Sequence, residues 1–148
     1  MTATDRLQAI AARVAIRRQA EYRRREQIEQ SRQACIAAAE QLRSRMGVLN
    51  GVPYDDGFLR IEPHGGTQDV AVIIINRTGH VGGGAYCLLT ITPQLEPGRP
   101  AEELDYRVFR PGDVDRPVMD ERFATEDAAL DRALDILEPL IHLPTLEG

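Results

Sequence analysis

The first 46 residues contain neither glycine nor proline, and all 12 glycines and 9 prolines of the chain come later. Ala, Arg, Gln, Glu and Leu dominate this stretch, and these residue types favour helix. The pattern predicts a helix from about Asp5 to Met46, with Thr4 or Asp5 as its N-cap and Gly47 as its C-terminal glycine. Such a helix would be about 63 Å long at ~1.5 Å per residue.

A helix of that length is too long to pack entirely on its own domain. A compact chain of 148 residues has a diameter of roughly 40 Å. We therefore expect the helix to project, to break or to pack on another chain. A charged stretch at residues 17–27 separates two apolar stripes on nearly the same helix face, formed by Leu7, Ile10 and Val14 and then by Ile28, Cys35, Ala39, Leu42 and Met46.

The remaining residues have the pattern of a sheet followed by a helix. Strands are expected at 59–62, 69–76, 85–92 and 105–110, with a short fifth strand at 118–123. Thr125 is the expected N-cap of the last helix, which Pro139 would kink or end. The predicted class is α+β, with a long N-terminal helix, an antiparallel four- to five-stranded meander sheet and a C-terminal helix packed on the sheet.

The second predicted strand, Asp69 to Asn76, is apolar almost throughout. Strands that are buried on both faces have this character. One face would be covered by the C-terminal helix. We expect the second cover to come from the N-terminal helix or from another subunit.

Charge divides the chain into two parts within one structural domain. Residues 1–46 form a basic arm with 10 Arg and 5 acidic residues, and residues 47–148 form an acidic body with 8 Arg and 18 acidic residues. All 18 basic residues are Arg, a bias that points to a high-GC bacterium or one of its phages. The chain shows no signal-peptide pattern and no apolar run of the length that a membrane span needs, so we expect a cytoplasmic protein without a membrane partner.

The motifs that suggest chemistry lack the residues that the chemistry requires. The glycine-rich stretch at residues 77–84 includes His80 but leads into a strand, and the chain has no Lys for a phosphate loop. The only serines, Ser31 and Ser44, lie in the predicted N-terminal helix, which excludes a serine hydrolase. Cys87 is expected to face the core with Leu89 and Ile91. The three histidines have no metal-ligand spacing, so we predict no catalytic residue, cofactor or metal.

The arginines of the N-terminal helix form the most specific pattern. Arg6, Arg13, Arg17 and Arg24 follow one edge of the apolar stripe, Arg18, Arg25 and Arg32 follow the other edge, and Glu21 lies between them. Basic rows beside an apolar seam are typical of helix–helix interfaces. The predicted partner-binding residues are Arg13, Arg17, Arg18, Tyr22, Arg24 and Arg25.

Two other interpretations of the same helix stay open. Clustered arginines with Tyr22 available for stacking also fit a phosphate-binding helix. Alternatively, the helix is a solvated surface element held by Glu21–Arg25 and Arg25–Glu29 ion pairs.

From these observations we expect a non-enzymatic protein-interaction protein, of adaptor or inhibitor type, that forms a homodimer and docks through its Arg-rich helix. A nucleic-acid-binding accessory protein that uses the same helix is the first alternative. The second is a phage- or plasmid-encoded inhibitor whose acidic body competes with nucleic acid for a host protein. A small enzyme without a recognisable motif is the last.

Overall fold

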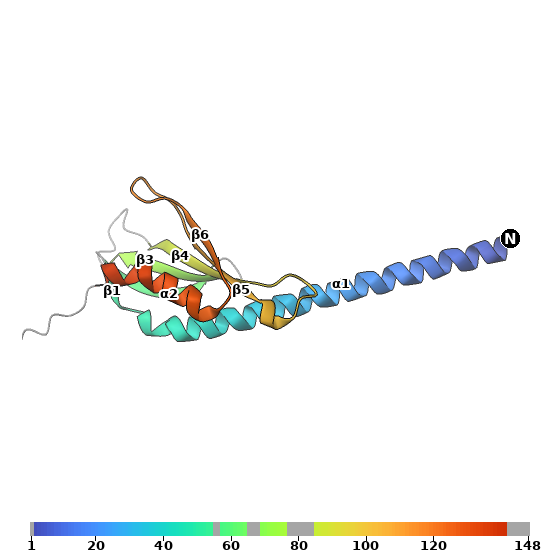
Figure 1. Ribbon diagram of the computed structural model, residues 1–148, viewed down its shortest axis with the longest axis horizontal. Helices are drawn as coiled ribbons and strands as arrows, with labels where there is room; N and C mark the ends of the chain where they lie inside the picture. The colour runs from blue at the N-terminus through green and yellow to red at the C-terminus, as the bar shows by residue number, and fades with distance from the viewer. Residues whose placement is uncertain (1, 55–56, 65–68, 77–84, 142–148) are drawn as a thin grey trace, which may run out of the picture.

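The computed structural model describes residues 2–54, 57–64, 69–76 and 85–141. A long helix, α1 (Ala3–Met46), precedes a six-stranded sheet, and a second helix, α2 (Glu126–Leu137), follows it (Figure 1). The strands form an antiparallel meander in sequence order: β1 (Pro53–Tyr54), β2 (Gly57–His64), β3 (Asp69–Asn76), β4 (Ala85–Gln94), β5 (Asp105–Arg110) and β6 (Met119–Phe123). Three short 3-10 helices complete the fold: η1 (Gly47–Leu49), η2 (Ala101–Glu103) and η3 (Glu138–Leu140). The predicted α+β class is confirmed.

The sheet has one strand more than the predicted maximum. The additional strand, β1, pairs with β2 through Pro53↔Phe58 and Tyr54↔Gly57. Tyr54 is buried and also forms an isolated bridge with Ile141. A two-residue strand is too short to show the alternation by which strands are recognised in a sequence. The predicted glycine-rich connection at 77–84, with His80, lies outside the described residues.

Both ends of α1 differ in detail from the prediction. The helix begins at Ala3, because Thr2 and Asp5 form a reciprocal capping box. The Thr2 hydroxyl accepts from the backbone N–H of Asp5 at 3.1 Å, and the Thr2 backbone N–H donates to the Asp5 carboxylate at 2.9 Å. The helix ends at Met46 with Gly47 as its C-cap, as predicted, but Gly47 does not have the left-handed conformation typical of a C-terminal glycine. Its φ is −56°, so the chain continues into η1, and the left-handed turn comes at Gly51 with φ 81°.

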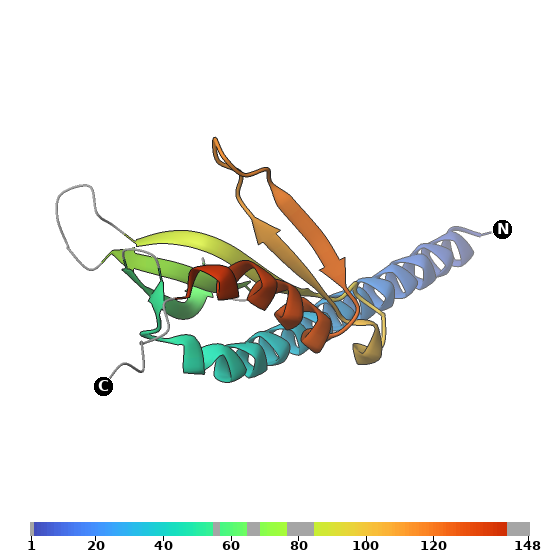
Figure 2. The ribbon, with the colours of Figure 1, turned by 60° about the vertical axis from the view of Figure 1, so that its left-hand side comes forward.

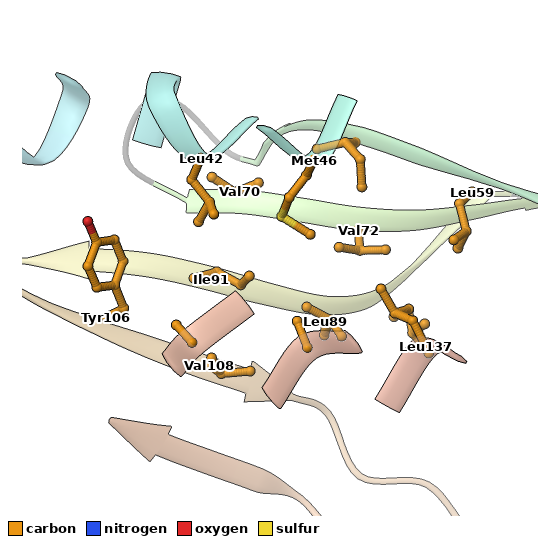
Figure 3. Close-up of a cluster of buried hydrophobic side chains, with 14 of the residues drawn as sticks. Leu42, Met46, Leu59, Val70, Val72, Leu89, Ile91, Tyr106, Val108 and Leu137 are labelled. Carbon is orange, nitrogen blue, oxygen red and sulfur yellow. The ribbon is translucent and has the colours of Figure 1, made fainter. Parts of the chain in front are cut away.

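One face of the sheet and the two helices form a single core (Figure 3). The last turns of α1 bring Leu42 and Met46 onto β3, and α2 packs Leu137 on the same cluster. Alternation along the strands places every second residue in this core, except at an irregularity in β4, where the consecutive Leu88 and Leu89 both belong to it. The sheet contributes Tyr54, Leu59, Ile61, Val70, Val72, Ile74, Leu88, Leu89, Ile91, Tyr106, Val108 and Met119.

The opposite face of β3 is also buried, as its apolar sequence predicted, but the cover differs from the expected one. Ala71 and Ile73 are 0% and 9% exposed. Their partners on β2 are Glu62 and Arg60, whose side chains form an ion pair of 3.2 Å. Long side chains on neighbouring strands therefore cover this narrow apolar strip, and its burial requires no second subunit.

The sequence predicted that Cys87 faces the core with Leu89 and Ile91, and this prediction was wrong. The register between β3 and β4 shifts at Val72/Ile73, so Leu89 pairs with Val72 while Cys87 pairs with Ile73. This β-bulge adds one residue to β4 and moves Cys87 to the opposite face, where it is half-buried. Simple alternation gave the wrong face because a single bulge inverts it.

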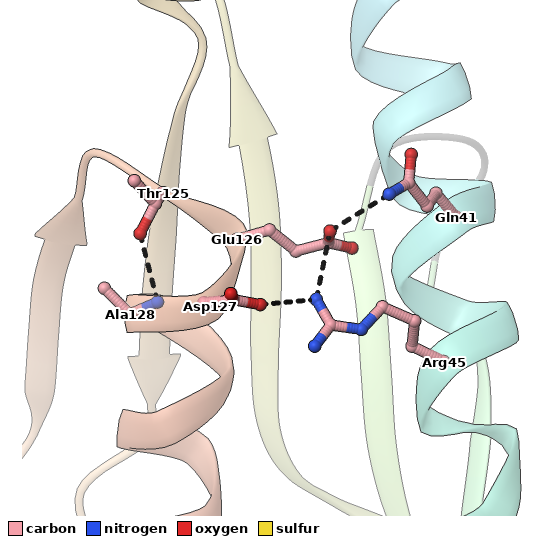
Figure 4. A network of polar contacts seen from close by, with 6 residues as sticks. All are labelled: Gln41, Arg45, Thr125, Glu126, Asp127 and Ala128. Carbon is pink, nitrogen blue, oxygen red and sulfur yellow. Dashed lines mark hydrogen bonds and ion pairs between the residues drawn. The ribbon is translucent and has the colours of Figure 1, made fainter.

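A polar network joins the C-terminal part of α1 to the start of α2 (Figure 4). Thr125 caps α2 as predicted, with its hydroxyl accepting from the Ala128 N–H at 3.1 Å. The Arg45 guanidinium lies 2.7 Å from Asp127 and 3.2 Å from Glu126, and Gln41 donates to Glu126 at 3.2 Å. The acidic first turn of α2 therefore stabilises its own N-terminus and also fixes the helix against α1.

Candidate interaction surface

The helix α1 consists of two parts that differ completely in burial. Every residue from Thr2 to Gln30 is exposed, whereas Ser31, Cys35, Ala39, Leu42 and Met46 are buried. We call residues 2–30 the projecting segment and residues 31–46 the docked segment. The projecting segment is about 43 Å long at ~1.5 Å per residue. It extends away from the body as a single helix (Figures 1 and 2).

The connection between β4 and β5 fixes the point at which the helix leaves the body. The Ser31 hydroxyl donates to the backbone carbonyl of Leu95. Gly98 has φ 85°, in the left-handed region, and a Cβ at this position would lie 3.5 Å from the Gln27 side chain. Glycine therefore suits the backbone conformation at this position, where the connection comes into van der Waals range of α1. These contacts hold the last turns before the docked segment.

An exposed apolar seam lies on one face of the projecting segment and is interrupted by the charged stretch at residues 17–27. Leu7, Ile10, Val14 and Ile28 are 67%, 54%, 41% and 45% exposed. At about 100° per residue, they lie on the same helix face as the buried residues of the docked segment. The helix face that contacts the body therefore continues, uncovered, beyond it. Ile16 is 66% exposed but lies on the far side of the helix, outside the seam.

All six predicted partner-binding residues lie in the projecting segment and are exposed. Arg13, Arg17 and Arg24 follow one flank of the seam, and Arg18 and Arg25 follow the other. Tyr22, which is 68% exposed, lies away from the seam. Their role as a binding site stays a prediction.

The ion pairs of the projecting segment differ from the Glu21–Arg25 and Arg25–Glu29 pairs that were expected for a solvated helix. Instead of pairing with Arg25, Glu29 lies 3.5 Å from Arg32 and accepts a hydrogen bond from Gln33 at 2.9 Å. That hydrogen bond, together with Arg32, lowers the pKa of Glu29. Glu21 has no ion pair within the described part of the chain, and neither do Arg6, Arg13, Arg17, Arg18, Arg23, Arg24 or Arg25.

An open groove of about 800 Å³ begins where the seam meets the body. Its walls come from α1, the end of β4 and the β4–β5 connection, and they include Ile28, Ser31, Cys35, Gln94, Leu95 and Asp105. Sequence reasoning missed this groove because its lining residues are far apart in the chain. Only the proline-rich composition between β4 and β5 marked this connection as irregular.

Two acceptor groups in the groove have no partner among the described residues. The Gln94 Oε1 atom is buried without a hydrogen bond. The Asp105 carboxylate forms no ion pair within the described ranges, whereas Glu96 and Glu103 lie 4.0 and 3.7 Å from Arg99. The Gln94 oxygen is fully covered, and Arg32, Arg99 and Arg122 also line the groove. The open walls therefore present charges of both signs beside apolar side chains.

The described residues give little basis for reaction chemistry at this surface. Burial raises the pKa of the Cys35 thiol in the groove, and burial likewise raises the pKa of Cys87. Both thiols are therefore protonated, weakly nucleophilic groups at neutral pH. The described ranges contain no group of three or more His, Cys, Asp or Glu side chains that could hold a metal ion. No helix in those ranges has the length and apolar character that a membrane crossing requires.

Comparisons with known proteins give no relative from which a role could be inferred. No protein-family model matches the chain, and no curated protein or solved structure is significantly similar to it.

Proposed function

We propose that this protein acts through protein–protein contacts and that the projecting segment of α1 docks on a partner protein. The observation that carries this proposal is the seam of Leu7, Ile10, Val14 and Ile28, whose side chains are all exposed and meet the body only at Ile28 among the described residues. Amphipathic helices bury such a seam in a groove or against another helix. An isolated helix is only marginally stable in water, so a partner would also stabilise the segment.

The arginines support a specific contact along the seam. They flank it on both sides and have no ion pair within the described residues. Arginine side chains at the edge of an apolar contact add charge complementarity and orient the partner. A helix that served only the fold would not need an uncovered seam with unpaired basic flanks.

The proposal can be tested with a photo-crosslinking amino acid placed at either of two exposed positions in the full-length chain. At Leu7, in the seam, we expect a discrete crosslinked protein product in cells. At Ile16, which is equally exposed on the far side, the same product should be absent or weak. Products of equal yield at both positions would show that the seam does not direct binding.

Nucleic acid is a second candidate, because the unpaired arginines include the run Arg23 to Arg25. A phosphate-binding helix loses affinity steeply with salt, by about 10³-fold or more between ~50 and ~200 mM for 6 to 10 phosphate contacts. Fluorescence anisotropy with a random-sequence DNA duplex would measure this dependence. Tight, salt-sensitive binding that persists in Leu7→Asp would favour nucleic acid over a protein partner.

A further inference from the structure

The seam, its basic flanks and the body beside them define what can lie along the projecting segment. We propose that the partner of the projecting segment is an acidic amphipathic helix of another protein, which lies along α1 and ends at the body. This inference depends on the proposed function, because it names the partner of the same surface. Length, charge and the position of the body each contribute to it.

The spacing of the seam residues and the length of the projecting segment match a second helix. Leu7, Val14 and Ile28 lie at multiples of seven residues, and the series continues into the buried Cys35 and Leu42. A seven-residue spacing is the pattern that matches a second helix. The projecting segment of about 43 Å corresponds to a partner helix of about four heptads at ~1.5 Å per residue.

The body limits how far the partner can extend along the seam. From Ser31 onward, the same face of α1 is buried against the chain's own body. A helix that lies on the seam must therefore end at this point, where the groove is open. A second copy in parallel register would bring its own body to the same place, so its arm cannot pair in this way.

Charge selects an acidic partner over a second copy of this arm. The projecting segment has seven Arg and four acidic residues, and its central part includes Arg17, Arg18, Arg24 and Arg25. Two such arms, paired antiparallel, would place these central arginines against each other. Carboxylates on both flanks of the partner would instead meet both rows. Glu21, inside the seam, calls for one basic residue opposite it.

The test uses the full-length chain and a synthetic four-heptad peptide. The peptide has Leu at the seam positions, Glu on both flanks and one Lys opposite Glu21, and a matched peptide replaces each flanking Glu with Lys. Fluorescence anisotropy should show that the acidic peptide binds at least about tenfold more tightly than the basic peptide. Leu7→Asp should weaken binding of the acidic peptide by about tenfold or more, because it places a charge in the seam. Ile16→Asp, on the far side, should leave binding unchanged. Equal binding of the two peptides, or no binding of the acidic one, would overturn the choice of partner.

Sedimentation equilibrium of the full-length chain tests the other occupant, a second copy. We expect the mass of one 16.5 kDa chain under conditions in which the acidic peptide binds. A dimer that Leu7→Asp dissociates would show that a second copy occupies the seam, and the homodimer expected from the sequence would replace this inference. A crosslinked protein product at Leu7 without peptide binding would keep the proposed function and exclude only this partner.

Discussion

The docked and projecting segments of α1 are parts of one uninterrupted helix, and they show that helix formation and packing are separate questions. The docked segment places Cys35, Ala39, Leu42 and Met46 against the body. The projecting segment has an apolar seam on the same face but buries none of it. Composition makes both segments helical, whereas within the described part of the chain only the docked one has a surface to pack on. The projecting segment is therefore available to a partner.

The largest expected difference between the two segments is in folding stability. Leu42→Ala should lower the free energy of unfolding by about 3 kcal/mol, because it leaves a cavity in a fully buried site. Val14→Ala, in the exposed part of the seam, should change it by less than about 0.5 kcal/mol. Urea denaturation measures both values. Similar losses for the two variants would mean that the projecting segment packs on the body.

Replacement of Arg17, Arg18, Arg24 and Arg25 by Gln should separate binding from folding. Binding of the acidic peptide should fall by about tenfold or more, because four charges beside the seam are lost. The melting temperature should change by no more than about 4 °C, since these side chains are exposed and form no ion pair among the described residues. Calorimetry and anisotropy on the same sample give both readings. An unfolded variant would make the segment a structural element.

A smaller effect is expected where the docked segment meets α2. Arg45→Ala removes the contacts with Glu126 and Asp127 and should lower the melting temperature, by less than Leu42→Ala does. Arg32→Ala, which removes the exposed pair with Glu29, is the matched control and should leave it nearly unchanged. If the two variants have equal effects, the network between α1 and α2 does not contribute to their packing.

The smallest expected effects concern pH and again separate the body from the tip of α1. The Arg107 guanidinium donates from Nε and Nη2 to the two carboxylate oxygens of Asp120, at 2.7 and 2.8 Å, and so lowers the pKa of Asp120 below its usual 3.8. The stabilisation is therefore present above the usual pKa and is lost as the pH falls through the lower, folded-state value. Asp120→Asn should destabilise the fold slightly at neutral pH, and its difference from the native chain should disappear in strong acid.

Asp5 offers the comparison within the projecting segment. Its hydrogen bonds with Thr2 lower the pKa of its carboxylate. The capping box should therefore be intact above the usual pKa and should open as the pH falls through the lower, folded-state value. Because this turn is distant from the core, Asp5→Asn should change the helical signal of the first turn and leave global unfolding unchanged. Chemical-shift changes confined to the first turns would agree with this, and a lower melting temperature would contradict it.

The sequence was most informative where a local pattern determines the structure. The absence of Gly and Pro before Gly47 predicted α1, and Thr125 with its acidic neighbours predicted the start of α2. Alternating or continuous apolar residues predicted the longer strands. The capping box from Thr2 to Asp5 is also a local sequence motif, but it has Asp where the usual motif has Glu, so it is harder to recognise.

The features that sequence reasoning missed depend on contacts between distant segments. The bulge beside Leu88 is a property of how β3 and β4 pair, and it decides which face Cys87 occupies. The groove combines side chains of α1 with Gln94 and Asp105, which meet only after the sheet has formed. A local sequence pattern shows neither the register of two strands nor which distant segments meet in a groove.

Hydrogen–deuterium exchange of the full-length chain, with and without the acidic peptide, tests most directly whether the projecting segment serves binding while the docked segment serves folding. Without peptide, we predict rapid exchange in residues 2–30 and slow exchange in residues 31–46, because only the docked segment is packed. With saturating peptide, the projecting segment should become protected while the docked segment stays as it was. Strong protection of residues 2–30 in the chain alone, or rapid exchange there with the peptide bound, would contradict the account.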